Sequence, residues 1–84
     1  MTVAHAILWK QAPNPYVKLA FVGDIKVALV QYPSPEMESN DYYVMILLPD
    51  MVKSDEVWRK SEAAAKKYVE DQVQAWFNRT GLLL

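Results

Sequence analysis

Residues 16–32, YVKLAFVGDIKVALVQY, decide the fold because they predict a tight β-hairpin. Two runs rich in β-branched and aromatic residues flank Gly23 and Asp24. A glycine in the first turn position can adopt the positive φ that a type II′ turn requires. The turn would pair Val22 with Ile25, and this pair sets the register of the whole hairpin.

Strict alternation along this register gives the hairpin two different faces. One is apolar except near its tip, where Lys26 lies; it carries Leu19, Phe21, Ala28 and Val30. The other face is less apolar, because Lys18 and Gln31 on it can reach water, and we expect it to be the exposed face. Its candidate partner-binding residues are Tyr16, Lys18, Val27, Leu29 and Gln31.

A second apolar stretch, YYVMILLPD at 42–50, predicts another strand, which Pro49 ends. Alternation again gives two apolar faces. One carries Tyr42, Val44, Ile46 and Leu48, and the other carries Tyr43, Met45 and Leu47. Both faces need a cover, which is a demanding requirement for so short a chain.

The remainder of the chain predicts one long helix over about 55–80, because apolar residues recur there at spacings of three and four. Either Ser54 or Ser61 could cap its start, and Gly81 is a natural stop. Trp76 lies on the apolar stripe together with Phe77, Tyr68 and Val73, so we expect it in the core.

These elements predict a single α+β domain, 1–84. Three to four antiparallel strands, at about 4–10, 16–22, 25–32 and 42–48, would form a sheet with the helix packed on one face. The first of these strands would place Ile7 and Trp9 on one side and Leu8 on the other. Because one helix cannot cover both faces, the second face should be exposed, dimerised or bound to a partner.

Composition narrows the classes of function. The chain has no cysteine, a formal charge of −1 and 52% hydrophobic residues. It therefore lacks disulfides, thiolate metal ligands and the basic excess of most nucleic-acid binders. No uncharged run approaches the roughly 20 residues of a membrane helix. We expect a cytoplasmic protein without a membrane partner.

No residue pattern predicts catalysis, a metal site or a cofactor. His5 is the one histidine and has no obvious catalytic partner. Glu36, Glu38 and Asp41 lie in a polar loop that lacks the ligand spacing and mid-loop glycine of a calcium site. These acids, and Trp58 among charged neighbours, are instead candidates for contact with a partner.

A basic cluster could contact nucleic acid. It consists of Arg59, Lys60, Lys66 and Lys67. Alternating acids favour ion pairs between helix turns instead, such as Lys66–Glu70 and Lys67–Asp71. We therefore expect nucleic acid not to be the partner, and keep a small nucleic-acid-binding domain as the second alternative.

The last third of the chain loosely resembles small accessory proteins of phages and prophages, which combine a β-meander with an alanine-rich helix. The matching residues are Ala63, Ala64, Ala65, Glu70, Trp76, Gly81 and Leu82. Some such proteins, several anti-CRISPR proteins among them, bind and block a host defence component. The resemblance implies an inhibitor that acts in the cytoplasm of the host cell.

The stretch from Tyr42 to Glu70 resembles the partial ribonuclease-H-like domain of HicB-type antitoxins. In both, a strand ends in Pro-Asp and an alanine-rich helix follows. Here MVKSDEVWRK, 51–60, replaces the glycine-containing loop of that family. This resemblance implies that the partner is a toxin.

The leading expectation is a non-enzymatic binding protein that presents an apolar sheet face to a host protein or to its own copy. The HicB-like antitoxin is the first alternative.

Overall fold

The computed structural model describes residues 6–36, 40–48 and 55–80. It confirms an α+β fold with one antiparallel sheet and one helix, but the sheet has five strands rather than three or four. The strands pair in sequence order, β1-β2-β3-β4-β5. They are β1 (Ile7–Gln11), β2 (Val17–Val22), β3 (Ile25–Gln31), β4 (Tyr42–Ile46) and β5 (Asp55–Arg59), followed by α1 (Glu62–Thr80).

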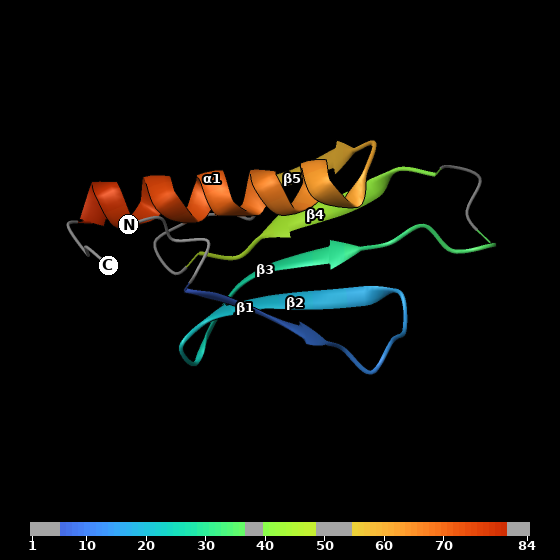
Figure 1. Ribbon diagram of the computed structural model, residues 1–84, viewed down its shortest axis with the longest axis horizontal. Coiled ribbons are helices and arrows are strands. Elements are labelled where there is room, and N and C mark those ends of the chain that lie inside the picture. Colours follow the sequence, from blue (N-terminus) through green and yellow to red (C-terminus); the bar gives the residue numbers. More distant parts are fainter. Residues whose placement is uncertain (1–5, 37–39, 49–54, 81–84) are drawn as a thin grey trace.

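The helix lies on one face of this sheet, over β3, β4 and β5, as Figure 1 shows. The β1–β2 half of the sheet extends beyond it at the other edge. Because α1 is the one helix of the described residues, they provide no second helix for the other face.

The predicted helix over 55–80 is wrong over 55–61, about two turns, because Asp55–Arg59 forms β5 and the helix begins only at Glu62. Here exposure alternates with a period of two: Val57 is partly buried against the core, whereas Glu56 and Trp58 are exposed. The edge of β4 offers backbone hydrogen-bond partners along one side of these residues. Strand pairing therefore outweighs the helical propensity of the segment.

The helix begins after Ser61, one of the two caps expected. The Ser61 Oγ accepts a hydrogen bond from the Ala64 backbone N–H at 3.1 Å, which satisfies one of the unpaired donors of the first turn. The other predicted cap, Ser54, and the predicted stop, Gly81, lie outside the described residues.

The β2–β3 hairpin departs from the predicted register at a β-bulge. Gly23 has the expected positive φ of 61°, and Val22 pairs with Ile25 as predicted. The register then shifts between Ala20 and Phe21, so Ala20 pairs with Ala28 and β3 contains one extra residue, Val27. A bulge of this kind redirects side chains and breaks strict alternation.

Because of the bulge, several side chains of the hairpin lie on the opposite face from the predicted one. Val27 and Ala28 are both fully buried, so Val27 does not lie on the exposed face. On β2 the assignment is reversed: Lys18 and Ala20 share the helix side, and Leu19 and Phe21 lie on the other. On β3, Leu29 and Gln31 do lie on the face away from the helix, as predicted.

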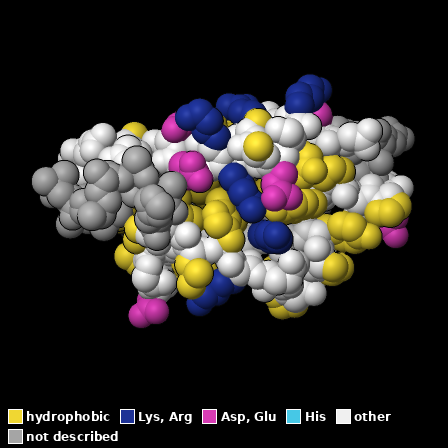
Figure 2. Space-filling view, viewed as in Figure 1, with side chains coloured by type: hydrophobic (Ala, Val, Ile, Leu, Met, Phe, Trp, Pro, Cys, Tyr) yellow, Lys and Arg dark blue, Asp and Glu magenta, His cyan; other side chains and the backbone are white. Residues whose placement is uncertain are grey.

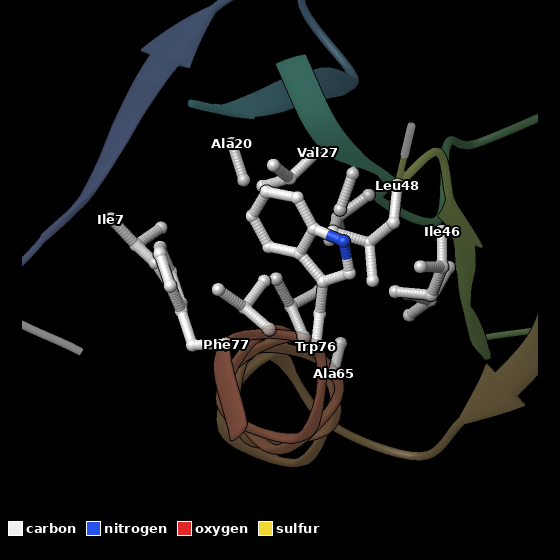
Figure 3. Packing of buried hydrophobic residues seen from close by; sticks show 13 residues of the cluster. Ile7, Ala20, Val27, Ile46, Leu48, Ala65, Trp76 and Phe77 are labelled. Carbon is white, nitrogen blue, oxygen red and sulfur yellow. The ribbon is translucent and has the colours of Figure 1, made fainter. Parts of the chain in front are cut away.

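The core fills the space between α1 and the sheet (Figure 3). Trp76 points from the helix towards Ala20 and Val27, and Phe77 points towards Ile7. Both aromatic residues are buried, as the sequence predicted. Val44 and Ile46 of β4 complete this layer together with Leu48, which follows the strand; β4 ends at Ile46 rather than at 48, but the predicted alternation of its buried residues is confirmed.

The open sheet face as a candidate functional site

The sheet face that points away from α1 is here called the open face. Its side chains form three rows, and each row runs across the strands through residues that are paired in the register. The middle row crosses all five strands. Successive pairings join its members, which are Lys10, Leu19, Leu29, Met45 and Glu56. A cation thus lies on β1, a carboxylate lies on β5, and three aliphatic side chains lie between them.

A second row lies nearer the β3–β4 connection and consists of Val17, Gln31, Tyr43 and Trp58. The Tyr43 and Trp58 ring centroids are 5.0 Å apart with the rings inclined by 52°. Trp58 nevertheless keeps 52% of its surface exposed. An exposed tryptophan that is already held by a neighbouring ring loses little entropy on binding, and such residues often dominate interfaces.

The third row, near the hairpin tip, consists of Leu8, Phe21 and Lys26. The Lys10 ammonium lies 4.8 Å from the Phe21 ring centroid, and Leu8 is 55% exposed. The open face is therefore apolar in its middle, and its charges stand at its margins.

The carboxylate of the middle row also affects its neighbour. Burial, and then the Glu56 carboxylate beside its hydroxyl, raise the pKa of Tyr43. A carboxylate disfavours a second negative charge close by, so Tyr43 stays a neutral hydrogen-bond donor across the ordinary pH range.

Three of the predicted partner-binding residues, Leu29, Gln31 and Trp58, come together on the open face. Two others do not join them. Val27 is in the core, and Lys18 lies on the helix side, with its ammonium 5.4 Å from the Tyr32 ring centroid.

The remaining predicted candidates lie near the loops. Tyr16 and Glu36 line a hollow of about 280 Å³, together with Asn14, Gln31, Ser34 and Pro35. Asp41 forms an ion pair with Lys60 at 3.1 Å. Glu38 and His5 lie outside the described residues.

The prediction missed Lys10, Leu19, Phe21 and Glu56 on the open face. For Glu56 the sequence offered no clear signal, because Asp55–Arg59 has two polar residues followed by two apolar ones, and only its burial in the folded strand alternates. For Leu19 and Phe21 no local signal marks the bulge, because it has no glycine at Val27 or Ala28.

The basic cluster is largely neutralised by nearby acids. Lys66 pairs with Glu62 at 3.2 Å rather than with Glu70, and Lys67 pairs with Asp71 at 3.3 Å as predicted. Figure 2 shows acidic and basic side chains side by side across the middle of one face of the molecule. A surface of alternating signs gives a phosphate backbone little net attraction.

Two tyrosines on the helix side have side-chain pKa values well above the ordinary one. Burial, and then the neighbouring Glu62 carboxylate, raise the pKa of Tyr32 to about 12. Burial, and then a hydrogen bond donated to the Asp55 carboxylate, raise the pKa of Tyr68 to about 12. The Tyr68 ring also lies 4.6 Å from the Arg59 guanidinium carbon, so it connects α1 to β5.

We expect these two tyrosines to ionise near pH 12 in the folded protein, instead of near the ordinary value of about 10. Because the unfolded chain releases these protons first, their contribution to stability is complete below pH 10 and is lost as the pH rises towards 12. Tyrosinate absorbance during an alkaline titration, compared with Tyr68→Phe, measures this. Ionisation of all tyrosines near pH 10 before unfolding would contradict it.

Among the described residues no cluster of acidic or histidine side chains could hold a metal ion. In the same part of the chain, no helix combines the length and apolar character needed to cross a membrane. The packing of the described residues leaves the open face without a cover. No protein-family model matches the sequence, and neither a curated protein nor a solved structure matches it.

Proposed function

We propose that this chain is a non-enzymatic protein-binding module and that the open face is its binding surface. The observation that carries the proposal is the middle row, in which Leu19, Leu29 and Met45 lie side by side on the face opposite the only helix of the described residues. A continuous apolar patch of this kind usually marks an interaction surface.

The distribution of charge supports binding rather than chemistry. Lys10 and Glu56 stand on the two outer strands, about 19 Å apart across four strand spacings. At that distance they cannot exchange a proton or act on one substrate atom. They can instead orient a partner whose own charges complement them.

The same layout disfavours nucleic acid as the ligand. The open face carries two lysines and one glutamate around an aliphatic centre, and Lys66 and Lys67 of the helix pair with acids. Neither the phage-type inhibitor nor the antitoxin expected from the resemblances is required by this surface. Both would use it in the same way, by burying it against another protein.

A photo-crosslinking amino acid placed at Leu29 tests the proposal in cells that express the chain. We expect covalent adducts to protein at position 29. Ala75, which is exposed on α1, provides the matched control position. Equal yields at the two positions, or no protein adduct at position 29, would mean that the open face is not a binding surface. Mass spectrometry identifies the captured chain, whether a second copy or a different protein.

A further inference from the structure

We propose that the open face binds a second copy of this chain, face to face, about a two-fold axis that runs parallel to the strands and passes by Leu29. This inference rests on the proposed function, since it names the partner of the same surface. It follows from the order of charges along the middle row and from the pairing that sets that order.

The middle row is complementary to itself. It reads Lys10, Leu19, Leu29, Met45 and Glu56 from β1 to β5. A two-fold axis along β3 places β1 of one copy over β5 of the other. Lys10 then faces Glu56 of the second copy, and Glu56 faces Lys10 of the second copy. Leu29 meets its own equivalent at the centre, and Leu19 lies over Met45 of the second copy.

In the second row, the same axis places a large side chain of one copy over a small side chain of the other. Beyond Val17 this row continues to Ala12, whose N–H donates to the Val17 carbonyl at 3.1 Å. The same axis places the exposed ring of Trp58 over the small side chain of Ala12 in the second copy. Large residues opposite small ones allow two sheets to approach to the usual separation of about 10 Å.

The other face-to-face arrangement, with the axis perpendicular to the strands, is electrostatically worse. It would place Lys10 over Lys10 and Glu56 over Glu56 of the two copies. The third charge of the open face, Lys26, opposes the proposed arrangement. It lies on β3, so the proposed axis brings it near its own equivalent, at the exposed hairpin tip. Lys26 should therefore weaken the proposed dimer, while the two middle-row pairs favour it.

The small size of the face indicates a weak dimer. Five strands at about 4.8 Å spacing and five residues of about 3.4 Å give a footprint of roughly 24 by 17 Å. Two such footprints total about 800 Å², which is less than the roughly 1,200–2,000 Å² of stable specific interfaces and corresponds to a weak, reversible association. We expect dissociation constants in the micromolar range, so the wild-type chain should be mostly dimeric at several hundred micromolar.

Sedimentation equilibrium of the purified chain, from a few micromolar to several hundred micromolar, tests the dimer. Leu29→Lys places two ammonium groups at the centre of the interface, so this variant should remain monomeric throughout. Circular dichroism should show that it keeps the wild-type fold, because Leu29 is partly exposed. A monomeric wild-type chain, or a dimer that Leu29→Lys leaves intact, would overturn the proposal.

Charge reversal tests the direction of the axis. Lys10→Glu and Glu56→Lys should each weaken self-association about tenfold, because each creates two like-charge contacts. An equimolar mixture of the two variants should restore a dimer, since each like pair becomes an opposite pair. Lys67→Glu, which makes the same charge change on α1, should have no such effect. Lys26→Gln should tighten the dimer.

Unchanged self-association in both single reversals would overturn the axis, even if Leu29→Lys abolished the dimer. A monomeric wild-type chain that still forms adducts with a different protein from position 29 would overturn this inference and leave the proposed function standing. Adducts limited to a second copy, together with the charge-reversal pattern, would support both.

Discussion

Replacing Trp76 with alanine should lower the free energy of unfolding by about 3–5 kcal/mol, the usual cost of truncating a buried aromatic side chain. Trp76 is 6% exposed, and its ring lies 5.0 Å from the Phe77 ring, centroid to centroid. It fills the space between α1 and the β2–β3 hairpin (Figure 3). A chain of 84 residues has a small core, so this loss could remove most of its stability.

Urea denaturation followed by circular dichroism measures the effect, and Trp58→Ala is the matched control. Trp58 is 52% exposed, so its removal should cost less than about 1 kcal/mol. If the two variants lost equal stability, the assignment of Trp76 to the core and of Trp58 to the open face would be wrong. Both proteins should be compared at low concentration, where association contributes little.

Val27→Asp should have an equally large effect and should prevent folding at ordinary temperature. The side chain of Val27 is fully buried beside Ala28, so an aspartate there would have to lose its hydration without gaining a partner. Ile25→Asp, on the same strand, is the control because Ile25 is 44% exposed. Soluble, cooperatively folded Val27→Asp protein would show that the bulge does not direct this side chain inwards.

Much of the architecture could be predicted because short-range patterns determine it. The alternation of Tyr42–Ile46 and the spacing of apolar residues in α1 each leave one arrangement that buries enough apolar surface. The Asp55–Arg59 strand could not be predicted in the same way. Its five residues fit either a helix start or a strand, and the free edge of β4, a long-range feature, decides between them.

The candidate site could be predicted in outline but not residue by residue. Two-sided apolarity in the strands implied one uncovered face, and Leu29 and Trp58 were correctly placed outside the core. The failures at Lys18 and Val27 have one cause. A one-residue change in register moves every following side chain to the other face. The bulge introduces such a change within the hairpin, and the sequence there contains no residue that requires it.

The bulge has a consequence for the changes of length that this hairpin can tolerate. Val27 is an additional residue in a ladder that is regular on either side of it. A hairpin without this residue would keep Ala28 inside, and would keep Lys26 and Leu29 on the open face, at the cost of the volume that Val27 fills. Insertion or deletion at this position therefore changes how tightly the core is filled without changing the chemistry of the surface that faces a partner.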